Sequence, residues 1–572
     1  MNILNMLRKL CLLLVFGLLP FTAAAEPPAG GHGFVAVALH DVADDSWALE
    51  DDAITTQRLI EFFDWLKGNG WTAISLDDVE RAARGERPLP PRAILLTFDD
   101  GYRSLYTRVF PLLLAYRYPV LAALVGEWME VPAGSQVIYN DRPTPRNRFI
   151  SWSEAREMQA SGLVEFAAHS HGLHTGIAAN PQGNVIPSAV TRAYGGSGYE
   201  NEAAQYQRLL DDARRARALL QHELGRAPRA WVWPYGRYSM IGIEAVRSAG
   251  FSHALTLDAG FGDARQPLAI PRAYPGADAK LGALAAMVRQ QRALPAAQRL
   301  VCVDPQGLAG KDAKETDARL GAAIERLRRL GATAVVIDAV STDAGGQLSA
   351  WFPTPLLPLR ADLLSRISWQ MQSRAGVETY IRLPAGTLRQ KLGSDEAVSA
   401  VFNDMGAHVP ASGLFIDDAP GLASLQPAAA GFTGQPALTR AARDGLDPAL
   451  LPATEKLALL GFRAVQRHRP DLRMALLVDS IPAGGPGQLA DLVLQRAAVD
   501  DDYFKPVTNR RSGLWLASAQ PPAAPLLASA VRRHLIGGGS AIGWCADDAV
   551  GDRPRATEVS PEASASTFPV LF

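Results

Sequence analysis

Two adjacent carboxylates, Asp99 and Asp100, follow a short apolar run at residues 93–96 that has the length of a buried strand. The motif reads T-F-D-D-G-Y. Paired carboxylates at the end of a strand can divide the work between ligating a metal ion and transferring a proton. An Asp-Gly pair alone indicates no more than a solvated turn. The interpretation therefore depends on what the rest of the chain places beside it.

Other polar residues also follow predicted strands. They are His40 after residues 34–39, His169, His171 and His174 after residues 164–168, and Pro234, Tyr235 and Gly236 after residues 231–233. In a barrel of alternating strands and helices, the carboxyl ends of the strands share one face, so these groups can converge in one pocket. A lone histidine, such as His253, is usually a core or surface residue. Three histidines within six residues, in one domain with an Asp-Asp pair, favour a metal site.

The predicted elements that position these groups alternate between strand and helix. In the first part of the chain, strands are predicted at 34–39, 93–97, 120–125, 164–168, 231–233 and 253–257, and helices at 56–67 and 202–223. Residues 176–200, rich in Gly, Pro and Asn, are predicted to form a long surface loop. The pattern indicates an α/β domain.

A second alternating series follows. Strands are predicted at 300–303, 334–337, 378–383, 413–416, 474–478, 513–517 and 541–545, with an eighth unplaced near 488–500, and helices at 315–329, 362–372, 454–467 and 526–534. This series predicts a (β/α)8-like barrel. The predicted domain organisation is a signal peptide at 1–25, a first domain at 26–275, a linker at 276–298 and a second domain at 299–572.

Composition excludes some classes of function. The chain has 572 residues, a net charge of -1 and 48% hydrophobic residues, so no basic excess points to nucleic acid. Arg8 and Lys9, an apolar stretch and Thr22-Ala23-Ala24-Ala25 have the form of a cleavable secretory signal. No later run is long enough for a transmembrane span, so we expect a periplasmic or secreted protein.

The three cysteines add little to this expectation. Cys11 lies at the start of the apolar stretch, and a lipid anchor is therefore not supported. Cys302 and Cys545 are expected as two separate buried thiols rather than one bridge.

At the motifs of the first domain, the chain resembles the polysaccharide deacetylases, also classed as family four carbohydrate esterases. Within this family it is most similar to the branch that acts on poly-β-1,6-N-acetyl-D-glucosamine. The matching segments are the strand ending in His40-Asp41-Val42, T-F-D-D-G-Y, H-S-H-G-L-H at 169–174, and R-A-P-R-A-W-V-W-P-Y-G at 226–236. The resemblance implies a distorted (β/α) barrel for the first domain.

The resemblance also implies roles. Asp99 would be the general base, Asp100, His169 and His174 the metal ligands, and His40 the acid, while His171 matches no ligand position. Tyr235 would hold the oxyanion through its backbone N–H in a turn shaped by Pro234. Hydrolysis of an N-acetyl amide needs an activated water, a stabilised oxyanion and an acid for the departing amine. One carboxylate and two imidazoles accept Zn²⁺, Ni²⁺, Co²⁺ or Fe²⁺.

The second domain carries a second acidic pair, Asp417 and Asp418, after the predicted strand at 413–416. With Trp351-Phe352-Pro353, residues 357–363 and residues 374–377, it resembles the C-terminal domain of the same deacetylases, which is a glycoside hydrolase. Asp417 or Asp418 would then be its acid catalyst. A glycan-binding platform without turnover is the alternative, because residues 480–510 lack an aromatic-rich stretch.

The predicted function is metal-dependent partial N-deacetylation of poly-β-1,6-N-acetyl-D-glucosamine for export and biofilm formation. The resemblance further implies coupling to an outer-membrane export porin. Two alternatives stay open. One is a deacetylase of another N-acetylated glycan, such as peptidoglycan or chitin. The other is a noncatalytic glycan-binding export protein.

Overall fold

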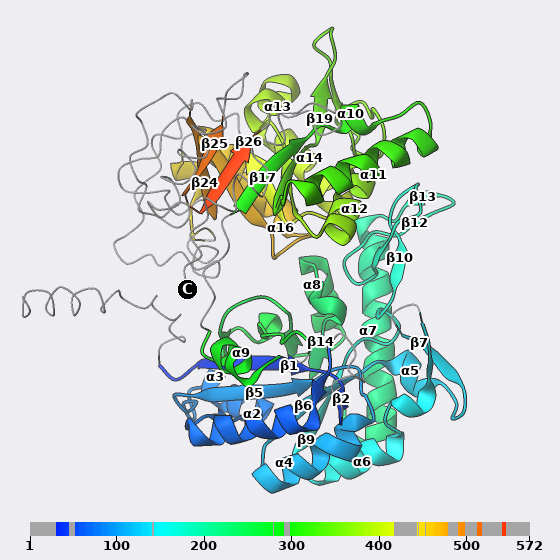
Figure 1. Ribbon diagram of the computed structural model, residues 1–572, viewed down its shortest axis with the longest axis vertical. Coiled ribbons are helices and arrows are strands. Elements are labelled where there is room, and N and C mark those ends of the chain that lie inside the picture. Colours follow the sequence, from blue (N-terminus) through cyan, green and yellow to red (C-terminus); the bar gives the residue numbers. More distant parts are fainter. Residues whose placement is uncertain are drawn as a thin grey trace, which may run out of the picture.

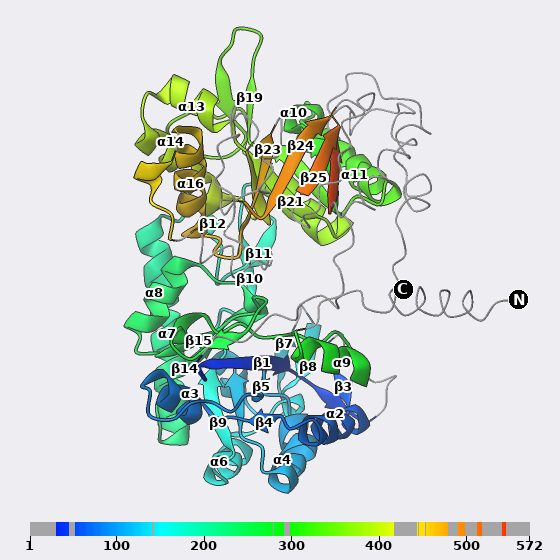
Figure 2. The same cartoon turned by 90° about the vertical axis from the view of Figure 1, so that its left-hand side faces the viewer.

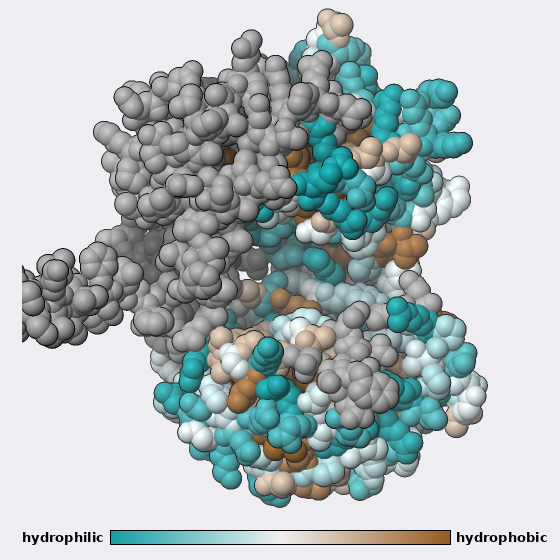
Figure 3. Space-filling model, in the orientation of Figure 1, coloured by the Kyte–Doolittle hydropathy of each residue, from teal (hydrophilic) through white to brown (hydrophobic). Residues whose placement is uncertain are grey.

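The computed structural model describes residues 30–44, 52–139, 142–277, 279–290, 298–416, 443, 445–451, 453–478, 490–497, 512–516 and 540–544. Two α/β domains follow each other along the chain and lie end to end (Figures 1 and 2). The part of their surface seen in Figure 3 is mainly hydrophilic. Within the described ranges, no helix combines the length and the apolar character that crossing a membrane requires.

A parallel sheet forms the centre of the first domain. Its strands run in the order β15-β14-β9-β6-β5-β1, with the bounds β1 (Gly33–Leu39), β5 (Ala93–Phe98), β6 (Val120–Leu124), β9 (Val164–Ala168), β14 (Ala230–Val232) and β15 (His253–Leu255). Every residue of β1, β5 and β6 is buried, as expected for strands covered on both faces. All six predicted strands are confirmed, with ends within two residues.

Residues 270–273 close the sheet into a distorted barrel. Ile270 pairs with Leu255 of β15, and Ala273 pairs with Val37 of β1. Backbone hydrogen bonds from Ile270 to β15 and from Ala273 to β1 are 2.8 to 2.9 Å long. Two short strands lie outside this closure, β4 (Thr72–Ala73) beside β5 and β16 (Gly262–Asp263) antiparallel to β1. The predicted distorted barrel is confirmed.

Helices cover the outside of this barrel. They are α2 (Thr56–Gly68), α3 (Leu76–Ala83), α4 (Phe110–Tyr116), α5 (Gly126–Glu130), α6 (Trp152–Ala160), α7 (Glu202–Leu224) and α8 (Met240–Ser248). Ser75 and Ser151 each begin a helix with a capping box. Residues 276–298, predicted as a linker, include α9 (Leu281–Val288), whose buried Leu284 and Val288 belong to the core of the first domain.

Residues 176–200 differ from the predicted surface loop. They form two short hairpins, β10 (Gly176–Ala178) with β11 (Val185–Pro187) and β12 (Tyr194–Gly195) with β13 (Gly198–Tyr199). Asn180 and Ser188 are each only 1% exposed. The polar composition suggested a solvated loop, but these side chains pack and form hydrogen bonds at the boundary with the second domain. Figures 1 and 2 show the hairpins between the two domains.

The second domain is a closed barrel of eight parallel strands, as predicted. In order they are β17 (Gln298–Val303), β18 (Ala334–Asp338), β21 (Glu378–Arg382), β22 (Gly413–Ile416), β23 (Arg473–Val478), β24 (Leu492–Ala497), β25 (Ser512–Leu516) and β26 (Ala541–Trp544). The unplaced strand of the sequence analysis is β24. Apolar side chains, among them Tyr380, Phe415 and Trp515, form a core cluster inside it.

The described helices around this barrel are α10 (Pro305–Leu308), α11 (Ala313–Arg329), α12 (Leu364–Gln370), α13 (Ala385–Leu392), α14 (Asp395–His408) and α16 (Ala453–Gln466). The predicted helix at 362–372 is shorter as α12 and continues as a π-helix at Met371–Ala375. The predicted helix at 526–534 lies outside the described residues.

Cys302, near the end of β17, is disulfide-bonded, so the expectation of two separate thiols is wrong for this residue. Its partner lies outside the described residues. A disulfide depends on tertiary contacts between parts of the chain that are far apart in the sequence, which residue spacing alone does not indicate. The first strand, β17, pairs with the last, β26, through Val301 opposite Trp544, which brings together parts of the chain that are far apart in the sequence.

Candidate metal and catalytic site

A cavity of about 640 Å³ opens at the carboxyl ends of the strands of the first domain. Six of the predicted site residues line it: His40, Asp99, Asp100, His169, His174 and Tyr235. Pro234 is buried in the adjoining turn. Each follows a parallel strand, so the shared face of the strand ends explains the convergence of residues from distant parts of the sequence.

Three side chains at the base of the cavity could hold a metal ion. The Nε2 atoms of His169 and His174 each lie 3.3 Å from Oδ1 of Asp100. This oxygen is buried and accepts no hydrogen bond from any described residue. A buried carboxylate oxygen without a donor, facing two imidazole nitrogens, fits a divalent cation with one oxygen and two nitrogen ligands.

Outer contacts orient these ligands. Nδ1 of His169 lies 2.9 Å from the carbonyl oxygen of Val232; donation to that oxygen leaves Nε2 free to ligate. Tyr139, at the end of β7 (Gln136–Tyr139), donates its hydroxyl to Oδ2 of Asp100 at 3.0 Å. Burial favours the neutral carboxyl of Asp100, but His174 and His169 outweigh it and hold its pKa well below the usual value. The group is therefore an anion.

Asp212 on α7 fixes the backbone of the turn that carries the histidines, at residues 169–174. Asp212 accepts hydrogen bonds from the backbone N–H groups of His171 and Gly172, at 2.9 and 2.7 Å. Burial raises the pKa of this carboxyl. The side chain of His171 turns away from the cavity and lies 2.9 Å from Oε2 of Glu130. This contact agrees with the absence of a ligand role for His171.

Asp99 faces the cavity beside the metal ligands without joining them. Its Oδ1 accepts a hydrogen bond from Nη1 of Arg272 at 2.8 Å, and its Oδ2 lies 3.9 Å from Nε2 of His40. Burial favours the neutral carboxyl, but the Arg272 guanidinium, with help from the two nearby histidines, lowers the pKa of Asp99 below its usual value. An ionised carboxylate is thus available as a proton acceptor.

The backbone around the cavity is strained. Asp100, Ser170 and Tyr235 have φ values of 70°, 75° and 57°, in the left-handed region that non-glycine residues rarely adopt. Such strain is typical of functional sites. Gly236 follows at φ 65°, and a Cβ there would meet Leu257 at 2.5 Å. The Pro-Tyr-Gly turn is therefore a specific conformation rather than a generic surface turn.

The residues lining this cavity that sequence reasoning missed include Asp52, Tyr139, Arg272 and Tyr274. Arg272 lies in the closing segment 270–273, which has no strand pattern. Tyr139 belongs to a hairpin of β7 with β8 (Arg142–Pro145) that carries no chemical motif. Tyr274 is 44% exposed and packs edge-on against His40, with ring centroids 5.4 Å apart. No local signal distinguishes these residues.

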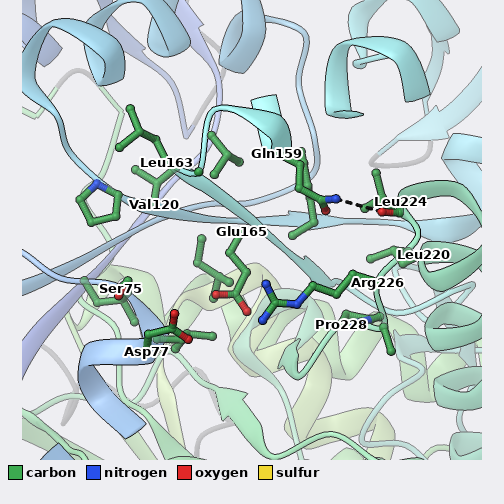
Figure 4. Close-up of a pocket in the computed structure, with 18 residues that line it drawn as sticks. Ser75, Asp77, Val120, Gln159, Leu163, Glu165, Leu220, Leu224, Arg226 and Pro228 are labelled. Atoms are coloured by element: carbon green, nitrogen blue, oxygen red, sulfur yellow. Dashed lines mark hydrogen bonds between the residues drawn. The ribbon is translucent and has the colours of Figure 1, made fainter. Parts of the chain in front are cut away.

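His253 lies at the amino end of β15, away from the cavity, and Nδ1 contacts the hydroxyl of Ser252. A second cavity, of about 200 Å³, also opens at the amino ends, where Val120 and Glu165 line it (Figure 4). Glu165 is paired with Arg229 at 2.7 Å. None of the predicted site residues of the first domain, all of which are described, lines this cavity, so the chemistry predicted for this domain belongs to the carboxyl ends.

Asp417 and Asp418, the predicted acids of the second domain, lie outside the described residues. Two strands of that barrel end in charged residues that are described. Asp338 of β18 and Arg382 of β21 form an ion pair, with Nη2 of Arg382 2.8 Å from Oδ2 of Asp338. The acid at the end of β18 thus has an ion-pair partner.

Comparison with protein families gives two matches. Residues 86–254 match the family model described as polysaccharide deacetylase. Residues 304–402 match the model described as hypothetical glycosyl hydrolase family 13.

Individual proteins are similar as well. The poly-beta-1,6-N-acetyl-D-glucosamine N-deacetylase of Escherichia coli (strain K12) is 36% identical over 365 residues, 63% of this chain and 54% of that protein. The chain thus spans about half the length of this curated relative. The Staphylococcus epidermidis protein of the same name is 23% identical over 210 residues, 36% of this chain and 63% of that protein. Among solved structures, the BpsB deacetylase domain from Bordetella bronchiseptica is 38% identical, covering 43% of this chain and 97% of that chain, with a TM-score of 0.39.

Proposed function

We propose that the chain is a metal-dependent N-deacetylase of poly-β-1,6-N-acetyl-D-glucosamine, because residues 86–254 match the polysaccharide deacetylase family and residues 304–402 match a glycosyl hydrolase family. The observation that carries this proposal is the convergence of Asp100, His169 and His174 beside an ionised Asp99 in one cavity. The names of the similar proteins support the choice of substrate.

Asp100, His169 and His174 would hold a divalent cation, for which Zn²⁺, Ni²⁺, Co²⁺ and Fe²⁺ all suit the donor set. When bound, the cation supplies Lewis acidity toward the acetyl oxygen and lowers the pKa of the attacking water. Asp99, fixed by Arg272, takes the proton from that water. The pair of adjacent carboxylates thereby divides between ligation and base catalysis.

His40 would return a proton to the departing amine. It lines the cavity between Asp99 and the exposed ring of Tyr274. An imidazole suits this role because its unperturbed pKa lies near 6.5. The backbone N–H of Tyr235, in the turn that begins at Pro234, would stabilise the oxyanion. Tyr235 is 40% exposed at the cavity, which agrees with contact to a polymeric substrate.

We propose that the second domain handles the same polymer, as a glycoside hydrolase with Asp417 or Asp418 as its acid. The family match at residues 304–402 supports this role. The proposed activity supplies partially deacetylated, positively charged polymer for biofilm formation, and an outer-membrane export porin is the proposed downstream partner.

We further propose that the protein is secreted or periplasmic, with residues 1–25 as a cleavable signal. The disulfide at Cys302 supports an oxidising compartment, where such bonds persist.

The test measures acetate release from β-1,6-linked N-acetylglucosamine oligomers and, in parallel, from chitin and peptidoglycan oligomers. The proposal predicts metal-dependent release from the β-1,6 oligomers, with mass spectrometry showing chain shortening only after deacetylation. Release from chitin or peptidoglycan oligomers alone would contradict the proposed substrate. Binding without release would contradict the enzyme assignment.

A further inference from the structure

The two hairpins at residues 176–200 leave the first domain directly after the metal ligand His174 and dock on α12 of the second domain. Nδ2 of Asn180 donates to Oγ of Ser365 at 3.2 Å, and both residues are only 1% exposed. Nε2 of Gln182 donates to the carbonyl oxygen of Asp362 at 2.8 Å. The segment is thus anchored on a neighbouring domain rather than left in solvent.

Further contacts strengthen this anchor. The hydroxyl of Tyr199 donates to Oδ2 of Asp362 at 2.6 Å, and the Tyr199 ring packs on His408 at 4.3 Å. Nη1 of Arg366 donates to Asn184 at 3.2 Å. Hydrogen bonds formed by buried groups are costly to break, because the groups left behind lack partners. The docked position of the hairpins is therefore well defined.

Ser188 of the same segment forms hydrogen bonds to the residues on both sides of His174 in the chain. The hydroxyl of Ser188 donates to the carbonyl oxygen of Leu173 at 2.9 Å, and its N–H donates to the carbonyl oxygen of Thr175 at 3.0 Å. Leu173 and Thr175 are the neighbours of His174 in the chain. A path of packed, hydrogen-bonded groups therefore runs from α12 through Asn180 and Ser188 to His174.

The orientation of the His174 ring depends on these backbone contacts more than that of the His169 ring does. Nδ1 of His169 is held by a backbone carbonyl, whereas Nδ1 of His174 is buried and has no hydrogen-bond partner among the described residues. The His174 ring is placed by its backbone and by packing on Trp128 and Tyr235, at 4.8 and 4.4 Å. Without the outer hydrogen bond that usually orients a metal-ligating histidine, backbone position decides where Nε2 points.

The second domain also contacts the segment that follows Tyr235. Arg237 pairs with Asp471 at 3.3 Å. The N–H of Met240 donates to the carbonyl oxygen of Arg467 at 2.9 Å. Since Tyr235 packs on His174, two of the segments that position this ligand are tied to the second domain, beside the first-domain contacts from Trp128 and Asp212.

We propose that the second domain is a positioning partner of the metal site in the first, and that Asp362, Ser365 and Arg366 act as positioning residues through the docked hairpins. The inference rests on the proposed function, because it takes His174 as a metal ligand. It assigns the second domain a role in the first reaction that is independent of any glycosidase activity of its own.

The test uses the full chain with Asp362→Ala, Ser365→Ala and Arg366→Ala combined, all on the second domain. The matched control combines Arg389→Ala, Lys391→Ala and Asp395→Ala, which removes polar surface contacts of the same domain away from the interface. Each chelated protein is titrated with Co²⁺, and the visible absorption band reports affinity and ligand geometry. Thermal unfolding checks that the variants are folded.

We expect Co²⁺ affinity to fall at least about fivefold in the interface variant, with a changed absorption band, and to stay within about twofold in the control. The single change Asp362→Asn leaves the backbone carbonyl in place and should reduce Co²⁺ affinity in the same direction but by less. It replaces the triple variant in the test if that variant does not fold. A folded variant with unchanged affinity and spectrum would overturn the inference. A wild-type protein that binds no Co²⁺ would instead overturn the proposed function itself.

Discussion

The two domains use the same architecture, parallel strands alternating with helices, but they treat charge at the strand ends differently. In the first domain, Asp99 and Asp100 are buried at 3% exposure each, and Oδ1 of Asp100 has no donor among the described residues. Asp99 is paired with Arg272, and Asp338 at the end of β18 in the second domain is likewise paired with Arg382. The difference between these described acids lies at Asp100, whose unsatisfied buried oxygen, rather than the shared architecture, makes a candidate metal site.

Backbone conformation follows the same contrast. Of the non-glycine residues with positive φ in the described ranges, Asp100, Ser170 and Tyr235 lie at the cavity of the first domain, and none lies in the second. Left-handed non-glycine residues cost free energy, so they persist where the surrounding structure imposes them. In the first domain, strained backbone conformations therefore lie beside the residues that form the site. The described part of the second domain has no non-glycine residue in such a conformation.

The largest expected effect comes from removing a ligand of the first domain. His174→Ala should abolish metal binding and acetate release together, because two ligands remain. The matched control is His171→Ala, which removes a histidine of the same motif that contacts Glu130 instead. It should retain the metal. Elemental analysis of the purified proteins measures the bound metal. Equal metal loss in both variants would contradict the assignment of His174 as a ligand.

An intermediate effect is expected at the hydrogen bond that orients Asp100. Tyr139→Phe removes the donor to Oδ2 and should weaken metal affinity about 10- to 100-fold, the range typical of outer contacts to metal ligands. Tyr116→Phe is the control, since its hydroxyl donates to Asp64 on the surface. Competition with a chelator measures both. Similar metal affinities in the two variants would show that Tyr139 does not support the metal site.

The stability of the second domain is expected to depend on pH. Burial lowers the pKa of His468 to about 2 and that of His408 to about 3. Both stay neutral in the folded chain, while the unfolded chain takes up protons below about pH 6.5. Stability is therefore complete above that pH and declines as the pH falls toward 3.

At pH 5, the loss from His468 alone should be about 2 kcal/mol relative to pH 7. Denaturant unfolding at the two pH values measures it. His468→Gln removes the titrating group and should reduce this difference, whereas His222→Gln, at an exposed position, should not. A difference that is the same in all three proteins would show that His468 is protonated in the folded state.

The smallest effect on acetate release is expected from changes in the second domain, and it tests whether the two proposed sites act independently. Asp417→Asn and Asp418→Asn should leave acetate release within about twofold of the wild type, because both residues follow β22 of the second domain in the sequence, whereas the proposed deacetylase site lies in the first. Chain shortening of deacetylated oligomers is measured in the same samples. Loss of acetate release in either variant would mean that the two sites are not separate.

Much of this organisation can be predicted from the sequence. Strand β22 begins and ends at the predicted residues, because a parallel strand buried on both faces reads as a continuous apolar run. The ends of β5 and β9, also close to the predicted ends, place Asp100 and His169 on one face. Local pattern thus gives the position of residues that directly follow strands.

Contacts that depend on tertiary closure could not be predicted. Arg272 meets Asp99 only because residues 270–273 close the barrel, and the disulfide at Cys302 likewise depends on tertiary contacts. Residues 176–200 have the composition of a loop, and only the neighbouring domain makes them ordered hairpins with buried polar groups. The left-handed conformation of Tyr235 has no sequence signal either, since it is imposed by its surroundings.

The most direct test of the central claim, that Asp99 is the base while Asp100 is a ligand, is Asp99→Asn assayed for metal content and for acetate release from β-1,6-linked N-acetylglucosamine oligomers. The account predicts the same bound metal as in the wild type and a loss of turnover of about 100- to 10,000-fold, the usual contribution of general-base catalysis. Loss of the metal together with the activity, or retention of both, would contradict the division of roles between the two carboxylates.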